Sequence, residues 1–341
     1  MEVTKSNISF NVVDGVLIKM KRLYPIGAKS VCIPRTLSGN VEIKAIGPNF
    51  CEGEYNKITV DNKIKEVKSD AFKLANVKEV VWSSGCDAIP AFCFSDSAIT
   101  VLSNIDHVKY IGNYAFSNTS LKEFVWPSMC REIPDSCFLN STVQYVRNIR
   151  SVEHVGPNAF AGSNIAEIRW PSACHTIPHS CFSSSKLSKI SNIQDVTVIK
   201  DFAFDTCMIE EFVIPCGVTK LPCGVFAWCE RLEKLVLHND ITDVGNSAFA
   251  YTSIPSFEWP ESCSVVSDYC FSYSKVERIS FHSNIKKIGR GAFSNCARLD
   301  CVDLSCLMFC EFDKLAFDNI GNCKVLMPYY ISPEQIDKIE A

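Results

Sequence analysis

The sequence predicts an α/β repeat solenoid, and three observations support this fold class. A phenylalanine recurs at a nearly constant spacing, the residues around it repeat one apolar pattern, and both ends of the chain depart from that pattern. The spacing is 22 residues eight times in succession and then 23, 22, 22 and 24. A unit this short cannot bury its own apolar side chains, so the coils must stack on one another. The recurring phenylalanines, here called the anchors, are Phe50, Phe72, Phe94, Phe116, Phe138, Phe160, Phe182, Phe204, Phe226, Phe249, Phe271, Phe293 and Phe317.

Each unit is expected to hold a strand, a corner, a second short extended piece and a turn. In the segment from Leu121 to Phe138, the run L-x-x-F-x-W carries alternating apolar residues typical of a strand, and Pro127 ends it. The later I-P-x-x-C-F run predicts a tight helical or 3₁₀ turn on the opposite side. Strands of successive coils would pair in parallel, giving a sheet on the order of 60 Å long.

A second period of 44 residues lies on top of the first. Alternate coils carry tryptophan at one strand position, with Ile214 in the one missing slot, and asparagine occupies the coils between them. Alternating large and small side chains along one row fill an interior without voids. The asparagines are expected to satisfy backbone groups at the corners. The tryptophans are Trp82, Trp126, Trp170 and Trp259, and the asparagines that follow the first three of them by one coil are Asn104, Asn148 and Asn192.

The ends of the chain are expected to cap the stack. Residues 1–45 contain strand-like segments joined by Gly and Asn turns, which predicts a β-rich N-terminal cap. Residues 46–325 hold about 12–13 coils of 22–24 residues. Residues 326–341 would form a C-terminal cap, in which Ser332-Pro333-Glu334 is a start signal for a short helix through Glu340. A last strand is expected at Cys323–Met327.

The units resemble the BspA-like, or Treponema-type, leucine-rich repeat, whose pattern is L-x-x-I-x-L-P followed by V-x-x-I-G-x-x-A-F-x-x-C. The run from Ile285 to Cys296, IKKIGRGAFSNC, is similar to it, and the resemblance covers roughly residues 40–325. Alternate units depart from it, with I-P-x-x-C-F in place of I-G-x-x-A-F. The resemblance implies a leucine-rich-repeat horseshoe with a long parallel sheet on one face. It also implies a surface or secreted protein that adheres to host proteins or to other cells.

Charge and segment composition exclude several classes of partner. The formal charge is −4 and the pI is about 5.9, with Lys and Arg scattered, so we expect no nucleic-acid partner. The first residues, MEVTKSNISF, lack the continuous apolar core of a secretion signal, and no apolar run is long enough to span a bilayer. The sequons at Asn7, Asn118 and Asn140 are weak evidence for secretion. Both a surface and a cytoplasmic location therefore stay open.

Of the 19 cysteines, the eight that lie at two recurring coil positions are expected to be buried and structural. Cys86, Cys130, Cys174 and Cys263 share a coil position with Val or Ile, and Cys93, Cys137, Cys181 and Cys270 share one with Ala. Two groups keep a metal hypothesis open: the C-terminal Cys296, Cys301, Cys306, Cys310 and Cys323, and the cluster Cys174, His175, His179 and Cys181. Ordinary packing is the better interpretation of the first group, and His175 is expected to face solvent. We therefore predict no bound metal and no cofactor.

The residues that point away from the core along L-x-x-F-x-W form the expected binding face. We predict contacts with a protein partner there, centred on Tyr145, Arg147 and Arg169, because Tyr and Arg dominate such interfaces. The alternative is a solvated sheet face with ordinary cross-strand charge pairs. No catalytic motif interrupts the repeat, which predicts a non-enzymatic adhesin-like protein or, alternatively, an intracellular scaffold with reduced thiols. The remaining candidates on this face are Glu123, Val125, Glu167, Lys189, Glu211 and Val213.

Overall fold

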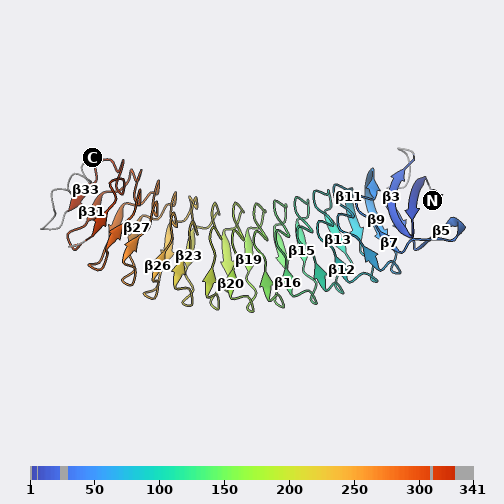
Figure 1. Ribbon diagram of the computed structural model, residues 1–341, viewed down its shortest axis with the longest axis horizontal. Helices are drawn as coiled ribbons and strands as arrows, with labels where there is room; N and C mark the ends of the chain where they lie inside the picture. Colours follow the sequence, from blue (N-terminus) through green and yellow to red (C-terminus); the bar gives the residue numbers. More distant parts are fainter. Residues whose placement is uncertain (1, 6, 24–29, 308–309, 327–341) are drawn as a thin grey trace. The chain divides into compact units, whose positions relative to one another are not determined.

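The computed structural model describes residues 2–5, 7–23, 30–307 and 310–326. The chain divides into two compact units, Met1–Cys174 and His175–Ala341. Within each unit the backbone winds through successive coils, each with one strand on the front and a shorter strand on the back (Figure 1). This is the stacked solenoid that the anchor spacing predicts, and it is built almost entirely from strands and turns.

The first unit begins with an antiparallel arrangement in which β2 pairs with both β1 and β3. Strands β7 and β8 then pair with β3 in parallel, which joins this segment to the coils that follow. The expected C-terminal helix at 334–340 and Met327 lie outside the described residues. The elements of the N-terminal segment are β1 (Glu2–Lys5), β2 (Ile8–Val13), β3 (Val16–Arg22), β4 (Ser30–Ile33), β5 (Thr36–Leu37), η1 (Ser38–Asn40), β6 (Val41–Glu42), β7 (Ala45–Ile46) and β8 (Cys51–Glu52).

Two rows of strands make up the coils, and each coil contributes one member to each row. The front strands of the first unit are β9 (Glu54–Val60), β11 (Asn76–Val81), β13 (Val101–Ser103), β15 (Glu123–Val125), β17 (Tyr145–Arg147) and β19 (Glu167–Arg169). Its back strands are β10 (Glu66–Val67), β12 (Ala88–Ile89), β14 (Tyr110–Ile111), β16 (Glu132–Ile133) and β18 (His154–Val155).

The second unit repeats this arrangement. Its front strands are β21 (Lys189–Ser191), β23 (Glu211–Val213), β25 (Lys234–Val236), β27 (Ser256–Glu258), β29 (Arg278–Ser280), β31 (Cys301–Asp303) and β33 (Lys324–Leu326). Its back strands are β20 (Thr176–Ile177), β22 (Val198–Ile199), β24 (Lys220–Leu221), β26 (Asp243–Val244), β28 (Val265–Val266), β30 (Lys287–Ile288) and β32 (Glu311–Phe312). The last front strand, β33, falls within the expected Cys323–Met327 segment.

The front strands pair in parallel, but they form short sheets and not the single long sheet expected. In the first unit β11 pairs with β13 and β15 pairs with β17, whereas β13 and β15 belong to separate sheets. Each of these pairs joins a tryptophan coil to the asparagine coil after it. Asn148 has a positive φ of 63°, and its Nδ2 donates to the Trp126 carbonyl at 2.8 Å. Asn104 Nδ2 donates to the Trp82 carbonyl at 2.6 Å in the same way, so the expectation that the asparagines satisfy corner backbone groups is confirmed for these two residues.

The most regular hydrogen bonds between coils lie in the turn that carries the anchor. The amide N–H of most anchors donates to the carbonyl of the residue just before the next anchor, as in Phe94 to Ala115 at 2.9 Å and Phe138 to Ala159 at 2.8 Å. The second unit continues the pattern with Phe271 to Ala292 at 2.7 Å. Because each bond links neighbouring coils, this turn ladder holds the stack together where the strand pairing is interrupted.

These turns are not helical, which corrects the expected α/β assignment. The residues two positions before and two after most anchors are left-handed, such as Phe92 at φ 55° and Asp96 at φ 58° around Phe94. A left-handed residue at each side of the anchor prevents a helical or 3₁₀ turn from forming. In the described part of the chain the one helical element is η1 (Ser38–Asn40). The fold is therefore a β-solenoid.

The anchors point inward and stack, as predicted. Within the first unit the ring centroids of Phe116 and Phe138 lie 5.5 Å apart, and those of Phe138 and Phe160 lie 5.7 Å apart with nearly parallel planes. In the second unit Phe182 and Phe204 lie 5.7 Å apart. All of these rings are fully buried. Burial of one large side chain per coil therefore supplies the continuous core of each unit.

The eight cysteines at the two recurring coil positions are buried, as predicted, whereas Cys32 and Cys216 are exposed. Several buried thiols also donate hydrogen bonds. Cys93 and Cys137 are fully buried, and burial raises the pKa of both thiols well above the ordinary value. In the second unit Cys207 Sγ donates to the Phe182 carbonyl at 3.1 Å, and Cys229 Sγ donates to the Phe204 carbonyl at 2.9 Å. These thiols are weak donors that satisfy the carbonyl of a neighbouring anchor.

We expect replacement of an anchor to destabilise the protein severely. Phe138→Ala removes a fully buried ring and leaves a cavity, which costs about 3–5 kcal/mol. The free energy of unfolding in urea, followed by circular dichroism, measures the loss. Tyr110→Ala on a back strand removes an exposed ring, so it should change stability by less than about 0.5 kcal/mol. Equal losses for the two variants would contradict the assignment of the anchors to the core.

Candidate protein-binding surface

The front strands of the first unit present two rows of side chains to solvent. In β15, β17 and β19 the first and third residues are exposed, while the middle residue points to the interior, as for Phe124. This alternation follows from the pleat of a strand, in which successive side chains project to opposite faces. The six predicted residues that lie on this front surface are Glu123, Val125, Tyr145, Arg147, Glu167 and Arg169.

Tyr145 and Arg147 form a small cluster with the neighbouring strand. Glu123 lies directly beside Tyr145, and Val125 lies directly beside Arg147, in the parallel register of β15 and β17. Arg147 Nη2 lies 3.8 Å from Glu123 Oε2, and the guanidinium carbon lies 5.9 Å from the centre of the Tyr145 ring. An ion pair this exposed contributes at most about 1 kcal/mol, so a partner can displace it at little cost. The cluster thus offers an aromatic ring, an apolar side chain and both signs of charge.

The other three predicted residues lie in the second unit. Lys189 begins β21, and Glu211 and Val213 are the first and third residues of β23; all three are exposed. Glu211 Oε2 lies 3.5 Å from Nζ of Lys234 on the next front strand. This surface is therefore also a mixture of charged and apolar side chains.

The side chains considered as metal ligands are placed as ordinary structural residues. His175 is exposed, as expected, and its Nδ1 lies 2.8 Å from the Asp195 carbonyl oxygen. Cys296 is buried and donates to the Phe271 carbonyl at 3.0 Å. Among the described residues no three His, Cys, Asp or Glu side chains come together in a way that could hold a metal ion. Within that same part of the chain, no helix has the length and apolar content needed to cross a bilayer.

Sequence reasoning missed a second group of exposed side chains, on the turn side of the second unit. Trp228, Tyr251 and Tyr273 each follow an anchor by two positions and are stacked ring on ring. The difference is visible in the sequence, because the equivalent position in the first unit carries Leu74 and then small residues such as Asp96, Asn118 and Asn140. Aligning the coils by their anchors, and comparing this column alone, would have found the aromatic residues.

Comparisons with known proteins agree with the coil geometry. A solved leucine-rich repeat protein from Bacteroides ovatus is 20% identical and aligns over 94% of this chain and 90% of its own, with a TM-score of 0.77. At this identity the likeness shows the fold alone. A leucine-rich cell surface protein from Faecalibacterium prausnitzii is 16% identical over 99% of this chain and 97% of its own, with a TM-score of 0.44, which is too low to support an argument. No curated protein matches the sequence.

The model of one repeat family matches most of the chain. The BspA type leucine rich repeat region, in six copies, matches residues 44–163, 109–233 and 197–324. These overlapping matches cover the anchors from Phe50 to Phe317. The chain belongs to the BspA type leucine rich repeat family.

Proposed function

We propose that this chain is a non-enzymatic protein-binding repeat and that its front surface is the binding face. The observation that carries the proposal is the exposed cluster of Tyr145, Arg147, Glu123 and Val125. Tyrosine and arginine supply large contact areas and directional hydrogen bonds, and they are enriched among residues that dominate binding energy. Membership of a leucine-rich-repeat family suggests the same general role, an interaction scaffold.

Rigid support from the core favours binding at this surface over a merely solvated sheet. Phe124 is buried directly beneath the cluster, between the exposed Glu123 and Val125. The middle residue of β19, Ile168, is buried in the same way. These buried residues hold the strands in place, so the backbone loses little conformational entropy when a partner docks. We infer that the partner is a folded protein or an extended segment that contacts several coils at once.

Two biological roles fit such a surface. An adhesin-like role, in which the protein attaches a cell to a host or neighbouring protein, is what resemblance to this family implies. An intracellular scaffold is the second candidate, and the thiol hydrogen bonds of Cys207 and Cys229 favour it, because each requires a reduced cysteine. We propose the adhesin-like role first because the family resemblance extends over most of the coils.

We expect the triple variant Tyr145→Ala, Arg147→Ala, Arg169→Ala to bind the partner at least about thirtyfold more weakly, since loss of one hot spot costs about 2 kcal/mol or more. Quantitative pull-down of the partner measures the change. A matched control carries Tyr110→Ala, Lys109→Ala and Arg131→Ala, which remove one tyrosine and two basic side chains from the back of the same unit. Unchanged binding by the first variant, or equal losses in both, would reject the front surface.

Thiol accessibility and location together separate the two roles. Burial raises the pKa of Cys174 to about 12 and that of Cys207 to about 12. Both thiols are therefore protonated at neutral pH, and in the folded protein they should react slowly with alkylating reagents at pH values below their pKa. On denaturation their pKa values return toward normal, and both should react quickly at pH 9. Protein isolated from its own cells should label at the surface if it is an adhesin. Exclusively cytosolic protein, with every thiol titrating after denaturation, would support the scaffold instead.

A further inference from the structure

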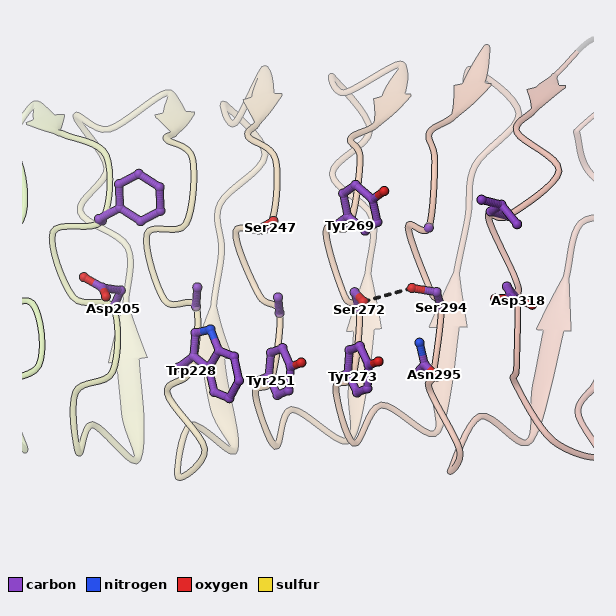
Figure 2. Close-up of a pocket in the computed structure, with 15 residues that line it drawn as sticks. Asp205, Trp228, Ser247, Tyr251, Tyr269, Ser272, Tyr273, Ser294, Asn295 and Asp318 are labelled. Carbon is purple, nitrogen blue, oxygen red and sulfur yellow. Dashed lines mark hydrogen bonds between the residues drawn. The ribbon is translucent and has the colours of Figure 1, made fainter.

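The turn side of the second unit contains an open groove lined by aromatic residues. It has a volume of about 580 Å³. Its floor is the row of residues directly after the anchors, and its two rims are the rows two positions before and two positions after them (Figure 2). We call this feature the aromatic groove. Its lining is Phe202, Asp205, Ala227, Trp228, Ser247, Ala250, Tyr251, Tyr269, Ser272, Tyr273, Gly291, Ser294, Asn295, Leu315 and Asp318.

One rim of the aromatic groove is a ladder of stacked rings. The ring centroids of Trp228 and Tyr251 lie 3.5 Å apart, and those of Tyr251 and Tyr273 lie 4.7 Å apart, with planes inclined by 10° and 3°. Trp228 is 47% exposed and Tyr273 is 51% exposed. The other four tryptophans of the chain are buried. This rim therefore presents a continuous aromatic edge to solvent (Figure 2).

On the opposite rim, the rings of Phe202 and Tyr269 each pack against a glycine of the following coil. A methyl group added at Gly224 would collide with the edge of the Phe202 ring, and one added at Gly291 would collide with the Tyr269 ring. Both glycines are left-handed, at φ 59° and 57°. Both rings are 40% exposed, and the His179 ring lies nearly perpendicular to that of Phe202, with their centroids 6.0 Å apart.

These aromatic residues occupy backbone positions that disfavour them. Phe202, Trp228, Tyr251, Tyr269 and Tyr273 all have φ between 56° and 60°. Left-handed backbone is costly for a bulky side chain and is usually taken by glycine, asparagine or aspartate. The fold imposes this conformation in nearly every coil, as at Leu74 and Phe92 in the first unit, so what distinguishes this part of the second unit is the exposed aromatic surface, which indicates a binding site.

The chemistry of the floor indicates what kind of molecule fits. It is formed centrally by Ala227, Ala250, Ser272 and Ser294, and the two serine hydroxyls lie 2.9 Å apart. At one end lies the Asp205 carboxylate, whose Oδ2 accepts a hydrogen bond from Thr206 at 3.4 Å, while its buried Oδ1 has no hydrogen-bond partner among the described residues.

None of the lining residues is basic, and the centre of the groove carries no charge. An anionic ligand would therefore find no cation, whereas the two aspartates, the tyrosine and serine hydroxyls and Asn295 can all accept hydrogen bonds from hydroxyl donors. Together with the exposed aromatic rings, these acceptors favour an uncharged ligand that is rich in hydroxyl groups.

We propose that the aromatic groove binds a neutral oligosaccharide. The C–H faces of its sugar rings would pack on the exposed rings of Phe202 and Tyr269 and against the Trp228 ladder. Its hydroxyls would exchange hydrogen bonds with the tyrosine and serine hydroxyls and with Asn295. Because the coils repeat at about 4.8 Å, the ladder of Trp228, Tyr251 and Tyr273 presents one aromatic side chain per coil along the length of a sugar chain. This site is separate from the front surface and does not depend on the role proposed for it.

Substitution by asparagine tests the proposal without threatening the fold. The first unit carries Asn118 and Asn140 at the ladder position with φ of 54° and 53°, so Trp228→Asn and Tyr273→Asn place a residue that suits the backbone. The full chain would be applied to an array of neutral hexose and N-acetylhexosamine oligosaccharides. The control is Tyr114→Asn in the first unit, where the ring stacks with Phe92 at 4.7 Å but lies outside the groove.

We expect the wild-type protein and the Tyr114→Asn control to bind the same glycans, and the double variant to bind them at least about tenfold more weakly. Titration of the best glycan should protect Trp228 from acrylamide quenching, and Tyr273→Asn should weaken that titration. If no glycan binds the wild-type protein better than the double variant, the proposal is overturned. Binding of basic peptides in a manner that depends on Trp228, with no glycan bound, would also overturn it and assign the groove to a protein partner.

Discussion

The structure depends on the turn that carries the anchor phenylalanine. In this turn the chain must place one large ring in the core, satisfy its own amides and leave room for the next coil. The left-handed residues on either side of the anchor meet these needs together. They direct the anchor N–H toward the following coil, as between Phe94 and Ala115, while the ring remains buried. Since each coil contacts mainly its neighbours, stability is a sum of such interfaces.

The same constraint determines where the protein can carry function. Interior positions are committed to packing, as the interchange of Cys with Ala and Val shows. The front strands and the left-handed rows of the turns are the surfaces that can change without disturbing the stack. On the front strands, Tyr145 and Arg147 project from a backbone held by buried neighbours. On the turn side of the second unit, aromatic residues occupy the left-handed positions of successive coils and present an exposed aromatic surface.

Much of this architecture could be predicted from the sequence, because inward-facing residues recur with a fixed period. The anchors, the buried cysteines and the corner role of Asn148 followed from spacing alone. The turn conformation did not, because its left-handed positions hold residues as different as Leu74, Phe92 and Ser136, whose identities carry no common signal. The broken front sheet also escaped prediction, because regular hydrogen bonding between neighbouring strands depends on backbone geometry that the residue pattern does not encode. The aromatic groove was missed because its residues are separated by a full coil and form a site only when the coils are stacked.

Amide hydrogen exchange tests most directly whether the turn ladder holds the coils together. If it does, the amides of Phe94, Phe116 and Phe138 should be among the slowest to exchange in the first unit, at least as slow as those of the front strands. Fast exchange at these three amides, with slow exchange confined to β15 and β17, would show instead that strand pairing holds the coils together and that the turn ladder does not.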